Sequence, residues 1–182
     1  MDKDTLTSLF QYHYWANRQL WRSLAALSDA QFAASSANGG PSIQAQAVGM
    51  VAHENLWVNY LWHGEVEFLE AAQFPTRASI RQEWDALEEE VLDFISELSP
   101  AELSRRVEPP FLGRSTSLQV WETLVYVVHH AVEQRAQVCQ HLRQIGTRPL
   151  AHDFLAFAAE HAHHGYSYPA FALARVAQEP RR

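Results

Sequence analysis

Residues 117–145, SLQVWETLVYVVHHAVEQRAQVCQHLRQI, read as one long amphipathic helix. Ser117 stands where an N-cap is expected, and Gly146 follows the segment as a stop signal. One side of this helix is apolar and holds Trp121, Leu124, Val125, Val128, Val132 and Leu142. The other side carries a polar stripe of His130, Gln134, Gln137 and His141. The stripe faces either a cleft between helices or bulk water, and periodicity does not choose between them.

The same helical spacing recurs along the rest of the chain. Long helices are expected over residues 4–26, 42–63 and 79–98, with a short one over 153–163. Prolines break residues 99–116, where we expect a turn with irregular or short extended structure and no strand pair. About fifteen residues connect the second and third helices, enough to cross the bundle. The sequence predicts an all-α four-helix bundle with a long crossover and a short fifth helix, as a single domain over residues 1–182.

The composition argues against two classes of function, nucleic-acid binding and membrane insertion. The net charge of −7 leaves no basic stripe for a nucleic acid, and no apolar run is long enough for a membrane helix. No signal peptide is visible at the start, so a cytoplasmic protein is expected. Cys139 is the only cysteine, which excludes an internal disulfide and favours a buried structural thiol.

A metal site is the main functional hypothesis. Residues four apart on a helix lie one turn above each other, so His130 and Gln134 could hold one ion together with His53 from another helix. The apolar neighbours of His53 would keep its imidazole neutral, although a core histidine without a ligand fits the same pattern. An amide oxygen is a poorer transition-metal ligand than imidazole, so Gln134 limits how far a catalytic interpretation can go.

Two other groups have metal-ligand chemistry. His129 and Glu133 are also four apart, and Glu133 is an alternative third ligand to Gln134. The cluster Glu160–His164 near the chain end is better explained as an exposed, adventitious site.

Polar residues also interrupt the apolar stripe of the first helix. His13 and Asn17 lie one turn apart there, so they either line a polar cleft or form hydrogen bonds that support packing. Trp15 projects from the opposite side, where an exposed indole would suggest a subunit interface.

Several short motifs, in order, resemble the DinB/YfiT-like family of four-helix-bundle metalloenzymes. The fragments are Tyr12–Asn17 in the first helix, Ser42-Ile43 and His53-Glu54 in the second, and His130–Gln137 in the fourth. Gly146, Pro149 and Asp153-Phe154 also fit the family's loop into the last helix. The likeness covers nearly the whole chain. Ala136 stands where the family has glycine, and Gln134 where it has the third metal-binding histidine.

The resemblance implies the site and its cofactor. It implies His53 and His130 as ligands of a divalent metal, nickel or zinc above others, with Gln134 in the third position. The surrounding pocket is expected to include His13, Asn17, Trp57, Arg135 and Gln137. Family relatives are often homodimers, and some are transferases or isomerases that use a low-molecular-weight thiol such as bacillithiol or mycothiol.

Two hypotheses follow from these patterns. The first is a divalent-metal-dependent hydrolase or thiol-dependent transferase that activates water or a thiol. The second is a metal-free bundle that binds a small ligand or a protein partner, with His53 and His130 as remnants of a metal site. No catalytic residue and no substrate can be assigned from the sequence.

Overall fold

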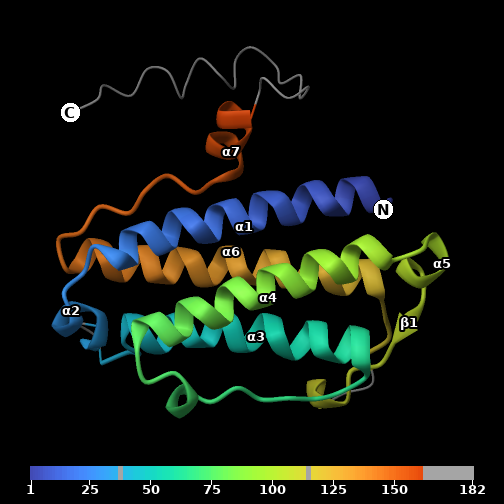
Figure 1. Ribbon diagram of the computed structural model, residues 1–182, viewed down its shortest axis with the longest axis horizontal. Helices are drawn as coiled ribbons and strands as arrows, with labels where there is room; N and C mark the ends of the chain where they lie inside the picture. The colour runs from blue at the N-terminus through green and yellow to red at the C-terminus, as the bar shows by residue number, and fades with distance from the viewer. Residues whose placement is uncertain (37–38, 114–115, 162–182) are drawn as a thin grey trace.

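Four long helices form the body of the molecule in this computed structural model, which describes residues 1–36, 39–113 and 116–161 (Figure 1). Their bounds are α1 Lys3–Ala25, α3 Ile43–His63, α4 Arg77–Glu97 and α6 Val120–Gln144. Helix α6 packs against α1 and α3, and α4 packs against the same two helices. The predicted four-helix bundle is confirmed.

The connection between α3 and α4 runs back along the length of the bundle, so these two helices are parallel (Figure 1). It contains the short 3-10 helix η1, Ala71–Gln73. Helices α3 and α6 are antiparallel, which brings the start of α3 beside the end of α6. The predicted long crossover is therefore present, and the α3–α6 pairing sets the position of the candidate site.

Local hydrogen bonds fix most helix starts. Ser42 accepts from Ala45 N at 3.1 Å, and Thr76 accepts from Ser79 N at 3.0 Å, so α4 begins two residues before the predicted Ser79. Gly64 ends α3 in the left-handed conformation, with φ of 74°, which favours glycine. These caps explain why the predicted bounds of α3 and α4 are nearly right.

The predicted Ser117 cap of α6 is wrong. The helix begins at Val120, and Glu122 accepts a hydrogen bond from the backbone N–H of Gln119 at 2.7 Å. Ser117 instead accepts a 2.8 Å hydrogen bond from Arg106. Residues 118 and 119 form a short strand, so the helix cannot begin before them.

That strand belongs to a small antiparallel ladder, which the sequence did not predict. Strand β1, Arg106–Val107, pairs with β2, Leu118–Gln119. Two residue pairs are too short for alternation to be visible in the sequence. The remaining short elements are α2 Asp29–Ala33, α5 Pro100–Leu103 and the 3-10 helix η2 Pro110–Leu112.

The last described helix, α7 Phe154–His161, covers part of α1. Trp15 lies beneath it at 7% exposure, with its ring 5.6 Å from that of Phe157 and its Nε1 donating to Glu160 at 3.1 Å. The predicted exposure of Trp15 is thus wrong, because α7 folds back over it. The suggestion that Trp15 lies at a subunit interface depended on this exposure and is no longer supported.

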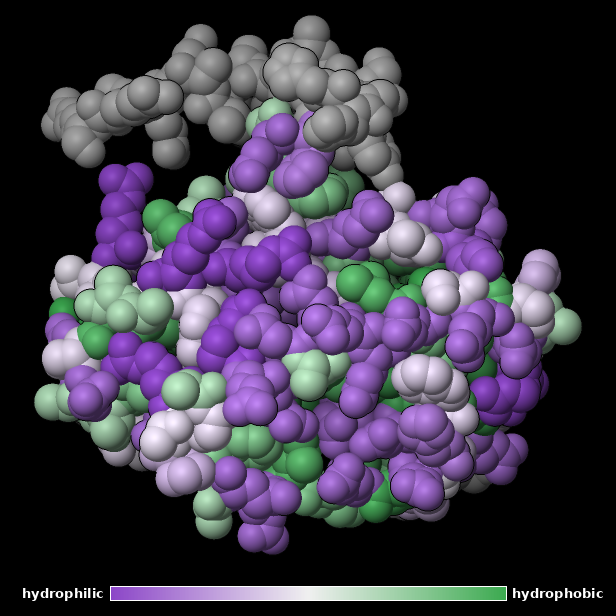
Figure 2. Space-filling model, in the orientation of Figure 1, coloured by the Kyte–Doolittle hydropathy of each residue, from purple (hydrophilic) through white to green (hydrophobic). Residues whose placement is uncertain are grey.

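Apolar side chains of all four long helices meet in one central cluster, which includes Phe10, Ile43, Ile80, Val91 and Leu124. The face shown in Figure 2 is mostly hydrophilic, with small scattered apolar patches. Among the described helices, none combines the length and apolar character needed to cross a membrane.

Candidate metal centre

The imidazole rings of His53 and His130 lie face to face between α3 and α6. Their centroids are 3.9 Å apart, and the ring planes are inclined by 33°. The antiparallel packing of the two helices brings together residues that are 77 positions apart in the sequence. Two nitrogen ligands of the kind that zinc and nickel prefer are therefore side by side.

Aromatic side chains surround His53. Trp57, one turn later on α3, donates from its indole Nε1 to His53 Nε2 at 3.1 Å, and the hydroxyl of Tyr126 lies 3.5 Å from the same nitrogen. Phe111 packs edge-on against Trp57, with 4.8 Å between centroids. Burial, and to a lesser extent the neighbouring His130, lower the pKa of His53 from 6.5 to about 4. His53 is therefore a neutral base near neutral pH, and its Nε2 accepts the indole hydrogen.

His130 is half-buried and has a carboxylate on its Nδ1 side. Glu133 Oε2 lies 4.0 Å from His130 Nδ1, and the Glu133 side chain is 66% exposed. Within the described residues, no three His, Cys, Asp or Glu side chains are grouped to hold a metal, so Glu133 does not complete a set with His53 and His130. Gln134 is half-buried one turn after His130. His129 is exposed.

The chemistry of this donor set fits a divalent ion only in part. Two imidazoles from separate helices supply strong nitrogen ligands, and Gln134 supplies an amide oxygen from the same stripe as His130. The indole of Trp57 must release His53 Nε2 before that nitrogen can bind an ion. These residues therefore fit a weakly held ion better than a tightly bound one.

A buried polar network lies on the inner side of α3. Glu54 Oε1 accepts from the hydroxyl of Tyr14 at 2.6 Å, and its other oxygen lies 3.0 Å from His13 Nε2. Burial alone raises the pKa of Glu54, but contact with His13 and the hydrogen bonds from His13 and Tyr14 outweigh it, so the pKa is lowered. Burial and the Glu54 charge raise the pKa of Tyr14 well above its usual value.

Arg135 joins this network from α6. Its Nη1 donates to Asn17 Oδ1 at 2.7 Å and lies 3.2 Å from His13 Nδ1. Arg135, His13 and Asn17 are at most 2% exposed. The structure therefore places these three residues, predicted to line the metal pocket, in the packed interior between α1, α3 and α6.

Sequence reasoning did not identify Glu54 and Tyr14 as members of this network. A signal was present, because His13 and Asn17 interrupt an apolar stripe and buried polar groups need partners. Their partners lie on other helices, so the spacing within α1 could not identify them.

Of the remaining predicted pocket residues, Trp57 contacts His53, whereas Gln137 lines a separate cavity near the end of α6. Cys139 is 1% exposed, and burial raises the pKa of its thiol. The predicted metal-binding cluster Glu160–His164 extends beyond the described residues.

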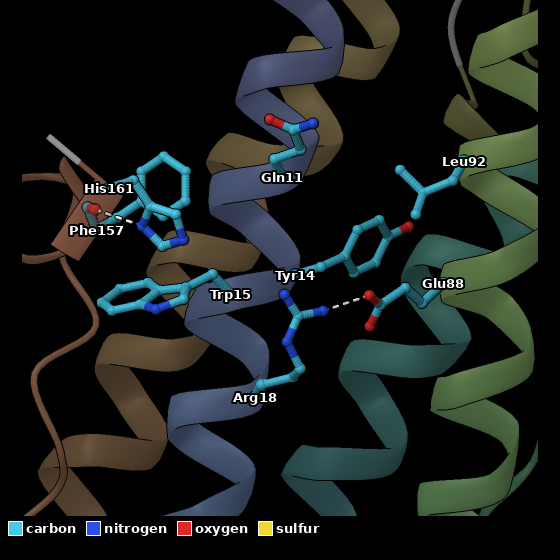
Figure 3. A pocket seen from close by; sticks show the side chains of 8 residues that line it. All are labelled: Gln11, Tyr14, Trp15, Arg18, Glu88, Leu92, Phe157 and His161. Carbon is cyan, nitrogen blue, oxygen red and sulfur yellow. Dashed lines mark hydrogen bonds and ion pairs between the residues drawn. The ribbon is translucent and has the colours of Figure 1, made fainter. Parts of the chain in front are cut away.

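A further cavity of about 430 Å³ lies between α1, α4 and α7 (Figure 3). It is lined by Gln11, Tyr14, Trp15, Arg18, Glu88, Leu92, Phe157 and His161. Arg18 pairs with Glu88 across it, and His161 Nδ1 lies 2.7 Å from the carbonyl oxygen of Phe157. Neither His53 nor His130 lines this cavity, so it is distinct from the candidate metal centre.

Comparisons with known proteins agree with this architecture. The family model described as the DinB family matches residues 1–166. YfiT from Bacillus subtilis is similar in structure, with a TM-score of 0.60 and 16% sequence identity. The match covers 81% of this chain and 91% of YfiT. YfiT is described as a probable metal-dependent hydrolase with an unusual four-helix bundle topology. The DinB-like protein YjoA from Bacillus subtilis has the same TM-score and identity over 81% of this chain and 95% of its own. No curated protein matches this chain. At this identity the two structures show a shared fold.

Proposed function

This chain belongs to the DinB family, and we propose that it is a divalent-metal-dependent hydrolase whose ion is held by His53, His130 and Gln134. One observation carries the proposal. The ring centroids of His53 and His130, which come from two different helices, lie 3.9 Å apart, so two nitrogen ligands are available at one place. The description of YfiT as a probable metal-dependent hydrolase supports the same reaction class.

When bound, such an ion lowers the pKa of a coordinated water and so supplies a hydroxide near neutral pH. The chain's own residues prepare the site for this chemistry. Because its pKa is about 4, His53 is not protonated at neutral pH, so an ion competes with the hydrogen bond from Trp57 for the Nε2 lone pair and not with a proton. Glu133 lies on the Nδ1 side of His130, at 4.0 Å, and so leaves Nε2 of His130 available to an ion.

The aromatic residues around the histidines shape access to the site. Trp57 is 3% exposed and shields one side of His53, whereas Tyr126 is 42% exposed and carries a hydroxyl beside the same ring. A substrate that approaches from solvent therefore meets Tyr126 first. Its hydroxyl can donate a hydrogen bond to a substrate oxygen or accept one from an attacking water.

The activity test compares chelator-treated protein with protein reloaded with nickel, zinc or manganese on a panel of chromogenic esters and amides. We expect turnover that depends on the added metal in the unaltered protein. We expect this turnover to be lost in His53→Ala and also in His130→Ala. A parallel assay with bacillithiol or mycothiol and an electrophilic acceptor separates thiol transfer from hydrolysis. Activity that survives both substitutions would refute the proposed centre.

A second candidate function has an observation of its own. The Trp57 indole already satisfies His53 Nε2 without an ion, as expected of a metal-free bundle that binds a small ligand. Stoichiometric metal binding that depends on both histidines would exclude this candidate.

A further inference from the structure

The cavity between α1, α4 and α7 is separate from the candidate metal centre and brings together a different set of chemical groups (Figure 3). Gln11, Trp15 and Arg18 line it from α1, where they share one face along roughly 10 Å of helix. Its volume of about 430 Å³ falls within the roughly 300–1,000 Å³ that is typical of small-molecule sites. The cavity is therefore large enough for a compact organic ligand.

Arg18 offers this cavity hydrogen-bond donors that the protein does not use. Its side chain is 43% exposed, and Figure 3 shows its guanidinium group between Trp15 and Glu88. The nitrogen Nη1 donates to Glu88 Oε1, whereas Nε and Nη2 form no hydrogen bond within the described part of the chain. These two nitrogens share one edge of the planar guanidinium group, so a carboxylate can accept from both at once.

Aromatic rings form an apolar wall of the same cavity. Trp15 and Phe157 both line it, and their rings pack edge to face at an interplanar angle of 61°. The hydrogen bond from the Trp15 indole to Glu160 holds the indole in one orientation. Because packing already fixes both rings, a flat apolar group can bind against them with little further loss of side-chain freedom.

We propose that this cavity binds a small aromatic carboxylate. The carboxylate accepts hydrogen bonds from Nε and Nη2 of Arg18, and the ring packs against the wall formed by Trp15 and Phe157. Among the described lining residues Glu88 is the only carboxylate, and it is already paired with Arg18. An organic cation would have to break this pair to reach Glu88, whereas a carboxylate binds the free edge of the guanidinium group and leaves the pair intact.

The test is a titration followed by NMR of the indole N–H groups, in full-length protein labelled with ¹⁵N-tryptophan and with chelator present. Phenylacetate carries both the ring and the negative charge, phenylacetamide lacks the charge, acetate lacks the ring, and phenethylamine has the opposite charge. We expect a saturable shift of the Trp15 signal with phenylacetate, and binding at least about tenfold weaker for the other three. The signal of Trp57, which lies beside His53, should not respond. A saturable shift at Trp57 instead of Trp15 would place the ligand at the candidate metal centre and overturn the proposal.

Variants of the ion pair provide the matched comparison. Arg18→Gln removes the charged donors and should weaken phenylacetate binding at least about tenfold. Arg22→Gln, on the same helix and outside the cavity, should leave the affinity unchanged. Glu88→Gln keeps an acceptor for Arg18 but removes a repelling charge, so it should tighten phenylacetate binding about twofold to fivefold.

The opposite response to Glu88→Gln, with phenethylamine bound more tightly than phenylacetate in the unaltered protein, would show a cation site and overturn the proposal. The absence of a saturable shift at Trp15 would also overturn it. So would equal phenylacetate affinity in Arg18→Gln and the unaltered protein.

Discussion

The indole Nε1 of Trp57 donates a 3.1 Å hydrogen bond to Nε2 of His53, one turn earlier on α3. This bond occupies a lone pair that a metal ion would use. Trp57 therefore acts as an internal competitor of the ion, and the strength of this one hydrogen bond limits the metal affinity of the site.

Replacing Trp57 with phenylalanine should tighten metal binding. Phenylalanine keeps most of the apolar volume but cannot donate a hydrogen bond. A competing interaction of about 0.5–1.5 kcal/mol is therefore removed, and the Kd for nickel or zinc should fall by a factor of about 2 to 13. Isothermal titration calorimetry measures the change. Trp21→Phe, at an indole packed against Trp84 away from the site, is the control. An unchanged or weaker affinity in Trp57→Phe would show that the indole does not compete.

Restoring a third imidazole should have a larger effect. In Gln134→His the new ring lies one turn after His130, and a nitrogen ligand in place of an amide oxygen should lower the Kd for zinc or nickel at least about tenfold. Gln140→His, at an exposed position of the same helix, should change it little. Equal gains in both variants would indicate adventitious binding by any added histidine.

The stability of the metal-free protein should fall as the pH is lowered from about 6.5 to about 4. In the folded state the pKa of His53 is about 4, against 6.5 in the unfolded chain, so within this window the unfolded state binds a proton that the folded state does not. Urea unfolding at several pH values, with chelator present, measures the slope of the unfolding free energy against pH. His53→Phe should flatten it, and a slope unchanged by the substitution would contradict the lowered pKa.

The buried network should make a large contribution to stability. Glu54→Gln removes the negative charge that compensates buried Arg135 and should cost about 3–5 kcal/mol of unfolding free energy. Glu88→Gln, which breaks the more exposed pair with Arg18, should cost less than about 1 kcal/mol. Urea unfolding of both variants compares them. Equal costs would mean that the network around Glu54 is not a coupled structural unit.

The helices were largely predictable because their signals are local. Apolar spacing, the Ser42 cap and the Gly64 stop all act within a few residues of the element they define. The crossover was predictable from the length of its loop alone.

Long-range contacts account for the errors. The bond between Arg106 and Ser117 shifts the start of α6, and the packing of Phe157 on Trp15 buries an indole predicted to be exposed. His13 and Asn17 were expected to need partners, but the sequence alone could not choose Glu54 and Arg135, which lie on other helices.

Metal stoichiometry, measured by elemental analysis and calorimetry on untagged protein, tests the central claim most directly. The proposed centre predicts one nickel or zinc ion per chain after loading, lost in both His53→Ala and His130→Ala and retained in His129→Ala. No bound ion after loading, or binding that survives the loss of both His53 and His130, would contradict it.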